Sequence, residues 1–571
     1  MAQRRRRRRR RNQLVPILVA MLLIILVAVA GIVTGFIKKY TPSDTRMELA
    51  DYYHTGEGEA ALILQDTISE AKGKIVDGRA YLPYSVITNE MGGRFYWDKE
   101  SEKMLYTTAT DTLEIKPEDT AYTIAGQTKQ QDYILVKEIG EEFYIALDFV
   151  EQYMPIQGEV YDKPDRIVVS YKWGDINTVS VSKDTEVRYQ GGIKSPILSD
   201  VKKGDTLILL EEMENWSRVM TTDGIDGYVE KKNLEKPQTT ELSYTGEYKE
   251  DYSSLTREHK INLVWHQVTS EAANAALGET IQNMAGVNVI SPTWFSVTAN
   301  EGTISSLASA DYVNEAHSRG MEVWGLIDNF NPDVSTLETL SSRSSREHII
   351  QKLLEEAQRV ALDGINVDFE ALTEEEAPHF IQFVRELSVV CRANNLVLSV
   401  DNPVPQFTGF YNRKEQGIVA DYVIIMGYDE HYVGSEEAGS VASLPWVEKG
   451  IQDTIAEVPA QRVINAVPFY TRLWKTEAGS LSSEAIGMDT AQEVVNTNNA
   501  QVYWDSDVSQ NYGSFEKDGC TYQIWIEDSQ SIAAKVQLVQ KYNLAGVAAW
   551  KLGFENSSIW QVITDNLSAS N

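Results

Sequence analysis

The C-terminal part of the chain alternates apolar runs with amphipathic stretches, and this alternation restricts the fold more than any other feature. From Leu255 to Asn571, eight apolar runs bounded by turn residues alternate with helical stretches. Such alternation is typical of βα units with parallel strands. Eight strands in these 317 residues are what a (β/α)₈ barrel needs. The expected strands are 261–268, 287–297, 322–330, 364–369, 396–402, 421–429, 462–470 and 545–553.

The fourth run carries three polar residues at alternate positions. Residues two apart on a strand point the same way, so Asn366, Asp368 and Glu370 are expected on one face, opposite an apolar face. Charged groups on a covered strand cost on the order of several kcal/mol each unless they are paired or used in chemistry. An edge strand whose acids face water is the alternative. Helix-like stretches on both sides of the run favour the covered strand.

The stretch Ala361–Leu372 resembles the signature of glycoside hydrolase family 18, the family of chitinases and related hexosaminidases. The family pattern is D-x-x-D-x-D-x-E; Asp363, Asp368 and Glu370 match it, and Asn366 replaces the middle aspartate. Residues 426–429 resemble the family at its sixth strand, and Trp550 resembles it at the eighth. The longer C-terminal stretch 524–553 is similar to the subgroup of spore and cell-wall peptidoglycan hydrolases. That subgroup also tolerates asparagine at the position of Asn366.

The resemblance implies a substrate-assisted retaining mechanism, an exception to the scheme that uses two carboxylates of the enzyme. It implies that Glu370 protonates the departing glycosidic oxygen while the 2-acetamido oxygen of the substrate attacks the anomeric carbon. It also implies that Asp368 holds the acetamido N–H, that Tyr428 binds the acetamido oxygen, and that Trp550 forms the floor beneath that sugar.

The chemistry of these side chains leads to two expectations. Glu370 must be protonated near neutral pH, and both burial and an anionic Asp368 are expected to raise its pKa. Because Asn366 cannot share a proton as an aspartate can, we expect Asp368 to stay ionised more readily and to accept an N–H from Asn366.

Other polar and aromatic residues lie at the expected carboxyl ends of barrel strands, where barrel enzymes place their active sites. Carbohydrate sites use acids for the glycosidic bond and flat rings for the sugar faces. Asp401 and Asp429 have a structural alternative, because acids at strand ends also cap helices. The candidates for substrate binding are Asn366, Trp294, Asp401, Asp429, Tyr470, Arg472 and Trp550.

The N-terminal segment predicts a membrane anchor. Arg4–Arg11 is an unbroken basic run, and residues 14–37 carry no charge; as a helix they span roughly 36 Å. The positive-inside rule places residues 1–13 in the cytoplasm and the rest of the chain outside the cell membrane. The alternative is a signal peptide cleaved at Ala28-Val29-Ala30. Gly31 and Gly35 form a GxxxG pattern, a weak indication of self-association through the helix.

Smaller modules are expected between the anchor and the barrel. Residues 38–72 are interpreted as a juxtamembrane spacer with one helix over 61–73. Residues 73–173 resemble the copper amine oxidase N-terminal-like module, and residues 176–236 resemble a bacterial SH3-like domain. Residues 237–254 form a linker, and an insertion at about 475–521 interrupts the barrel, which runs over 255–571.

Composition excludes several classes of function. The net charge is −31 although the N-terminus is basic, so the acidic body argues against nucleic acid as a partner. Two cysteines without a C-x-x-C pair exclude a disulfide framework. The seven histidines show no H-x-x-x-H or H-E-x-x-H spacing, and the copper amine oxidase-like module lacks a histidine cluster, so we expect no metal and no cofactor.

Together these patterns predict a multidomain protein with a transmembrane helix, a small α+β module, an SH3-like β-barrel and a (β/α)₈ barrel. The expected function is cleavage of β-1,4 linkages in an N-acetylglucosamine-containing glycan, with peptidoglycan preferred to chitin. A non-hydrolytic sugar-binding wall scaffold is the main alternative, because Asn366 departs from the family pattern. Retention of Glu370 argues against this alternative.

Overall fold

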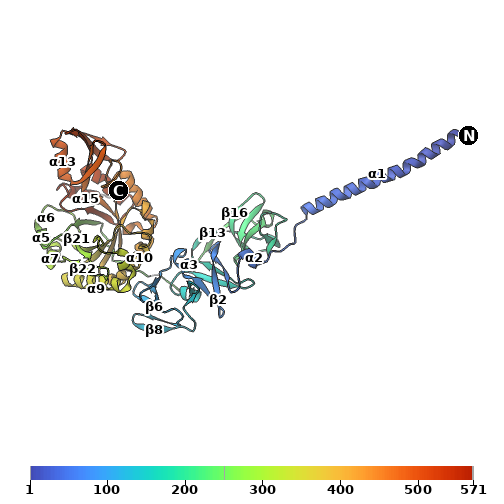
Figure 1. Ribbon diagram of the computed structural model, residues 1–571, viewed down its shortest axis with the longest axis horizontal. Coiled ribbons are helices and arrows are strands. Elements are labelled where there is room, and N and C mark those ends of the chain that lie inside the picture. Colours follow the sequence, from blue (N-terminus) through green and yellow to red (C-terminus); the bar gives the residue numbers. More distant parts are fainter. Residues whose placement is uncertain (1, 250, 569–571) are drawn as a thin grey trace. The chain divides into compact units, whose positions relative to one another are not determined.

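The computed structural model describes residues 2–249 and 251–568, and the chain forms two compact units. One unit comprises Met1–Gly93 and Ile134–Lys249, and the other comprises Arg94–Tyr133 and Glu250–Asn571. Figure 1 shows both, coloured along the sequence. The side chains of Arg4–Arg11, on which the predicted cytoplasmic tail depends, lie outside the described part.

The first unit begins with helix α1 (Ala2–Tyr40), of which Val15–Tyr40 is long and apolar enough to cross a membrane. A seven-stranded sheet follows, in the order β11-β12-β1-β2-β3-β10-β9. Its strands are β1 (Ala60–Leu64), β2 (Thr67–Val76), β3 (Arg79–Pro83), β9 (Val136–Ile139), β10 (Glu142–Ala146), β11 (Gln157–Tyr161) and β12 (Arg166–Ser170).

The expected helix over 61–73 is wrong, because this segment forms β1 and the first part of β2. Strand β1 pairs in parallel with β12, with Leu62 opposite Ile167, and all five β1 residues are buried. Pairing with a strand about a hundred residues away decides the conformation here, and local periodicity does not reveal such a partner.

A second seven-stranded sheet forms the SH3-like module, in the order β15-β14-β18-β17-β16-β13-β19. Its core includes Val187, Val219 and Val229, and Tyr53 from α2 (Leu49–Tyr53) packs into the same core. The segment expected to be a spacer therefore contributes core residues. The strands are β13 (Gly174–Ser180), β14 (Thr185–Arg188), β15 (Ile197–Val201), β16 (Thr206–Glu212), β17 (Trp216–Met220), β18 (Asp226–Glu230) and β19 (Gln238–Leu242).

The second unit contains the predicted barrel, with all eight expected strands. They pair in parallel, and β20 closes the barrel by pairing with both β21 and β33. A short strand, β22 (Ile304–Ser306), extends the sheet beside β21. In chain order the barrel strands are β20 (Ile261–His266), β21 (Val289–Val297), β23 (Glu322–Asp328), β24 (Gly364–Asp368), β25 (Val397–Pro403), β26 (Tyr422–Met426), β27 (Val463–Pro468) and β33 (Gly546–Trp550).

Two apolar cores hold the barrel together. The larger lies between the strands and the surrounding helices, and the smaller includes the inward-facing side chains Trp265, Trp324 and Leu326. The helices that contribute buried residues to the larger core include α7 (Ala310–Ser318), α9 (Arg343–Val360), α10 (Ala377–Ala393), α11 (Arg413–Val419), α12 (Leu444–Ile455), α14 (Ser529–Lys541) and α15 (Ile559–Ser568).

The insertion is a five-stranded antiparallel sheet with helix α13 (Met488–Thr497), in the order β29-β28-β32-β31-β30. It occupies Tyr470–Ile526, slightly more than predicted, because β28 starts directly after the seventh barrel strand. Its first strand therefore carries the candidate residues Tyr470 and Arg472. The strands are β28 (Tyr470–Glu477), β29 (Ser480–Gly487), β30 (Gln501–Asp505), β31 (Gln510–Lys517) and β32 (Cys520–Ile526).

A further five-stranded sheet of the second unit comes from residues 94–133, inside the range that resembles the copper amine oxidase module. Buried ion pairs join it to the barrel helices: Glu415 accepts from Arg94 at 2.5 Å and from Arg385 at 2.7 Å. These residues therefore fold with the barrel. The strands are β4 (Phe95–Asp98), β5 (Lys103–Thr107), β6 (Thr112–Ile115), β7 (Ala121–Ile124) and β8 (Gln127–Gln130).

Candidate active site

Three carboxyl groups stand side by side on adjacent barrel strands. Asp328 of β23 lies opposite Asp368 of β24. Val367 lies opposite Val400 of β25, so the next residues, Asp368 and Asp401, are neighbours. Adjacent strands are about 4.8 Å apart. We call Asp328, Asp368 and Asp401 the carboxyl row.

Asn366 lies one inward-facing position below Asp368, and its amide makes four hydrogen bonds. Its Nδ2 donates to Asp401 Oδ1 at 2.8 Å and to Ser399 Oγ at 3.0 Å. Its Oδ1 accepts from Trp265 Nε1 at 2.9 Å and from Ser291 Oγ at 3.2 Å. These four bonds use both donors and both lone pairs of the amide.

The prediction that Asn366 donates to Asp368 is therefore wrong. Residues two apart on one strand are about 7 Å apart, whereas a neighbouring strand is about 4.8 Å away. The amide accordingly bonds across the sheet to Asp401.

Asp368 is buried, and its Oδ1 has no hydrogen-bond partner among the described residues. Burial raises its pKa well above the ordinary value, and the neighbouring Asp401 and Glu370 raise it further. Burial also raises the pKa of Asp401, although the Asn366 hydrogen bond opposes this shift. Burial next to other carboxyls thus favours the neutral acid of Asp368, and the expectation that Asn366 leaves Asp368 more readily ionised than an aspartate at position 366 would stays a prediction.

Glu370 follows β24 and is half-buried. Asn329 binds its backbone on both sides: the Glu370 N–H donates to Asn329 Oδ1 at 3.0 Å, and Asn329 Nδ2 donates to the Glu370 carbonyl at 3.1 Å. Burial raises the pKa of Glu370, with further contributions from the charges of Asp429 and Asp328. The direction is the one expected, but the acids responsible lie on other elements.

Tyr470 of β28 contacts the acid that follows β26, and the candidate Arg472 lies on the same strand. The Tyr470 hydroxyl donates to Asp429 Oδ1 at 2.5 Å, and the Tyr470 ring lies 6.1 Å from the ring of Tyr428. Burial raises the pKa of both tyrosines, so both keep their hydroxyl protons. Arg472 is buried and donates from Nε to Ser483 Oγ at 3.0 Å.

Trp550 ends the last barrel strand and packs against the inner core of the barrel. It is half-buried, and its ring centroid lies 6.1 Å from that of Trp265. Trp265, buried beside it, is the residue that donates to Asn366. The two indoles thus line the inner wall close to the carboxyl row.

The prediction that Trp294 lines the site is wrong. Its side chain is 2 % exposed, belongs to the core between strands and helices, and donates from Nε1 to Asn274 Oδ1 at 2.9 Å. A register shift between Thr293 and Phe295 places one extra residue at this point of β21. This β-bulge breaks the alternation on which the prediction depended.

Trp265 is a residue of the site that the sequence did not mark as a candidate. Asp328 and Asn329 follow the third predicted strand, a position that marks them as candidates in a barrel. Trp265 gave no such signal, because an indole inside a strand is usually core packing. Within the described part of the chain, no group of three His, Cys, Asp or Glu side chains is arranged to hold a metal ion.

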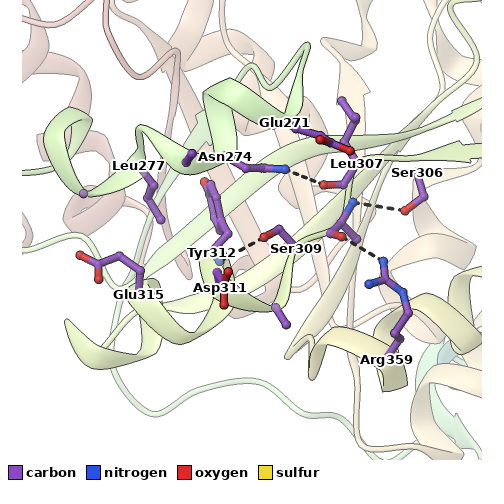
Figure 2. A pocket seen from close by; sticks show the side chains of 14 residues that line it. Glu271, Asn274, Leu277, Ser306, Leu307, Ser309, Asp311, Tyr312, Glu315 and Arg359 are labelled. Atoms are coloured by element: carbon purple, nitrogen blue, oxygen red, sulfur yellow. Dashed lines mark hydrogen bonds between the residues drawn. The ribbon is translucent and has the colours of Figure 1, made fainter.

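A cavity of about 830 Å³ lies elsewhere in the unit, between α5 (Glu271–Ala275), α6 (Leu277–Thr280) and α7. Figure 2 shows its lining, in which Asn274 donates to the Leu307 carbonyl at 2.7 Å and Arg359 donates to the Ala308 carbonyl at 2.9 Å. None of the carboxyl-row residues lines it. The carboxyl row therefore remains the candidate active site.

Comparison with protein families gives three matches along the chain. The model of glycosyl hydrolases family 18 matches residues 309–555, which include the carboxyl row and Glu370. The copper amine oxidase N-terminal domain matches residues 65–167, and the bacterial SH3 domain matches residues 183–235. The order of the three matches is the order predicted from the sequence.

The relatives of this chain include a glycosylase and a cortical fragment-lytic enzyme. The glycosylase YvbX of Bacillus subtilis is 23 % identical over 316 residues, which cover 52 % of this chain and 92 % of that protein. The cortical fragment-lytic enzyme of the same organism is 24 % identical over 239 residues, covering 40 % and 55 %. The structure of the Bacillus cereus spore cortex-lytic enzyme SleL, 19 % identical with a TM-score of 0.50 over 58 % of this chain and 78 % of that one, shares the fold.

Eight closed parallel strands, the acids at the ends of β23 to β25 and the match over 309–555 agree with one another. Residues 309–555 therefore form a glycosyl hydrolase family 18 domain, in a multidomain chain that also carries matches to the bacterial SH3 domain and the copper amine oxidase N-terminal domain.

Proposed function

We propose that the protein is a glycosidase that cleaves β-1,4 linkages next to N-acetylglucosamine, with peptidoglycan preferred to chitin. The observation that carries this proposal is the half-buried carboxyl of Glu370, whose pKa is raised by burial and by nearby acids. A carboxyl whose pKa is raised keeps its proton to higher pH than an ordinary glutamate and can protonate a leaving glycosidic oxygen. The relationship to a cortical fragment-lytic enzyme supports a cell-wall glycan as the substrate.

The mechanism we propose uses the substrate's own acetamido group as the nucleophile. Glu370 donates its proton to the departing oxygen as the acetamido oxygen bonds to the anomeric carbon. Asp368 accepts the acetamido N–H and offsets the positive charge that develops on the ring formed. Water then opens this ring, with Glu370 accepting the water proton, so the enzyme returns to its starting state.

The surrounding side chains have supporting roles in this proposal. Tyr428, which keeps its phenolic proton, donates to the acetamido oxygen. Trp550 lies beneath the sugar, because a half-buried indole offers a flat apolar face to a pyranose. Tyr470, Asp429 and Arg472 bind hydroxyl groups of the neighbouring sugar from one side.

The test measures new reducing ends when the full-length chain in detergent acts on muropeptide glycan strands and on chitin oligomers. Glu370→Gln should lower the rate by about 10²- to 10⁴-fold, the usual contribution of a general acid. Glu374→Gln is the matched control, because Glu374 is exposed on the loop after the site. If neither glycan is cut although both bind, the chain is a sugar-binding scaffold and the proposal fails.

We further propose that α1 anchors the enzyme in the cell membrane, with the N-terminus in the cytoplasm and the barrel outside. The apolar length of Val15–Tyr40 supports a membrane span. Extraction at alkaline pH should leave the intact chain in the membrane fraction. Recovery of a soluble chain that starts after Ala30 would identify a cleaved signal peptide instead.

A further inference from the structure

The two faces of the insertion sheet have different surroundings. Helix α13 packs on one face, where its Ala491 and Val495 form an apolar cluster with Ile524 and Ile526 of β32. Successive residues of a strand point to opposite faces. Trp525, which lies between these two isoleucines, therefore belongs to the face that points away from α13. We call this face the open face of the insertion.

Three aromatic side chains lie side by side across the open face. Trp525 of β32 pairs with Tyr512 of β31, and Tyr512 pairs with Tyr503 of β30. The ring centroids of Trp525 and Tyr512 are 5.0 Å apart, and those of Tyr512 and Tyr503 are 5.3 Å apart. We call Trp525, Tyr512 and Tyr503 the aromatic row.

The aromatic row begins beside the candidate active site. Leu473 of β28 lies opposite Ile524, so the residues next to them, Arg472 and Trp525, are neighbours on the open face. Tyr470 shares this face of β28 and binds the acid that follows β26. From β28 to β30 the row crosses three strand spacings, about 14 Å. It therefore forms a continuous path from the site to the outer edge of the insertion.

Exposure to solvent increases along this path. Arg472 is 8 % exposed, Trp525 and Tyr512 are half-buried, and Tyr503 is 59 % exposed. Single exposed apolar side chains are common on protein surfaces, whereas contiguous apolar patches with a polar rim mark interaction sites. The aromatic row is contiguous, and one end of it lies at the candidate active site.

Uncharged polar side chains flank the aromatic row on one side. Gln523 of β32 lies opposite Ser514 of β31, which lies opposite Gln501 of β30. The Gln523 amide donates to the Tyr512 hydroxyl at 2.9 Å. Flat rings beside neutral amide and hydroxyl groups match a sugar chain, because its ring faces are apolar and its edges carry hydroxyl groups. An acidic ligand would need basic side chains along the row instead.

Stabilisation of the sheet is the structural alternative, because aromatic pairs across strands stabilise a sheet by themselves. The same two strands carry such a pair on the face toward α13, where the rings of Phe515 and Tyr522 stack at 4.8 Å. That pair has no connection to the candidate active site. The aromatic row differs because it continues from Arg472 and ends in an exposed ring.

We propose that the aromatic row binds the part of the glycan chain that extends beyond the sugars held at the active site. Successive sugar rings stack on Trp525, Tyr512 and Tyr503, and the flanking amides bind their hydroxyl groups. The ligand is thus an uncharged, β-1,4-linked sugar chain, and peptide stems are not needed for binding. This inference rests on the glycan substrate proposed above, and it makes the insertion select long chains over short ones.

The test measures the Kd of a chitin dimer and of a chitin hexamer by calorimetry, using the full-length Glu370→Gln chain in detergent to suppress cleavage. Adding Tyr503→Ala should lower the preference for the hexamer, expressed as the ratio of the two Kd values, by about 5- to 10-fold. Tyr503→Phe keeps the ring and should keep the ratio. Trp504→Ala is the matched control, because Trp504 is also an exposed aromatic residue of β30 but points to the opposite face.

Tyr503→Leu keeps apolar bulk without a flat ring, so it should lower the ratio as alanine does. An unchanged ratio in Tyr503→Ala or Tyr503→Leu with wild-type Tm overturns the inference, and so does an equal loss in Trp504→Ala. A loss seen only with peptide-bearing muropeptide strands would assign the row to peptide stems and also overturns it. Binding needs no cleavage, so a wild-type chain that prefers the hexamer but cuts no glycan refutes the proposed hydrolysis and leaves this inference standing.

Discussion

Asn329 binds the backbone of Glu370 through both atoms of its side-chain amide, at 3.0 Å and 3.1 Å. The two bonds connect the loop after β23 with the residue that follows β24, so the acid is oriented by a neighbouring strand. Replacement by alanine should lower kcat by about 10²-fold, because a misplaced catalytic group loses its alignment with the leaving oxygen. Steady-state kinetics on chitin oligomers measure the effect, with exposed Asn496→Ala as the control. A variant with wild-type kcat would show that Asn329 does not orient Glu370 for catalysis.

The charge of Asp429 raises the pKa of Glu370, second only to burial. Asp429→Asn should therefore lower that pKa, and the alkaline limb of the pH–rate profile should move to lower pH. The sign follows because the acid is active when protonated and loses its proton earlier without the nearby anion. Glu436→Gln in the same loop removes an equal charge from an exposed position and should leave the profile unchanged. A shift to higher pH would contradict the electrostatic assignment.

Arg346 links the sheet of residues 94–133 to the barrel helices. It is fully buried, binds Glu386 from Nε at 2.8 Å and lies 3.6 Å from Asp98. Arg346→Met should lower the free energy of unfolding by about 3–5 kcal/mol, because it leaves buried carboxyls without their cation. Denaturant unfolding of the full chain measures this. Arg359→Met on the same helix is the control, because the Arg359 side chain is 52 % exposed in its salt bridge with Glu356, and it should change stability by about 1 kcal/mol or less.

Glu415 makes the stability of the second unit sensitive to acid. Burial alone would raise its pKa, but Arg385 and Arg94 more than offset this, and the net pKa is lowered from 4.5. The unfolded chain therefore binds the proton more tightly, so the stabilisation is present above pH 4.5 and is lost as the pH falls through the folded-state pKa. In Glu415→Gln, stability should be lower at pH 7 and should fall less between pH 5 and pH 3. Equal acid sensitivity in both proteins would contradict this account.

The barrel was predictable from the sequence because its signals are local. Each of the eight strands is an apolar run with turn residues at both ends, and the strand bounds agree within a few residues. The prediction of a helix over residues 61–73 was wrong for the opposite reason. Strand β1 gains its stability from pairing with β12, and no local pattern reveals that partner. The packing of residues 94–133 on the barrel helices depends in the same way on distant partners.

The acids of the site were predictable as residues, but their relationships were not. The strand period correctly placed Asn366 and Asp368 among the inward-facing residues. Which carboxyl Asn366 binds depends on the register between β24 and β25, and this register is a property of the folded barrel. Trp294 was misplaced because a single extra residue in β21 breaks the alternation. Sequence patterns thus identify the candidate residues, whereas pairing across strands decides which carboxyl receives a hydrogen bond and so influences which carboxyl is protonated.

The most direct test of the central claim is the anomeric configuration of the first product released from a chitin oligomer, followed by proton NMR before mutarotation. Attack by the substrate's acetamido group and then by water is a double displacement, so the account predicts a product that retains the β configuration. First-formed α product would show direct attack by water and would contradict the proposed roles of Asp368 and Glu370.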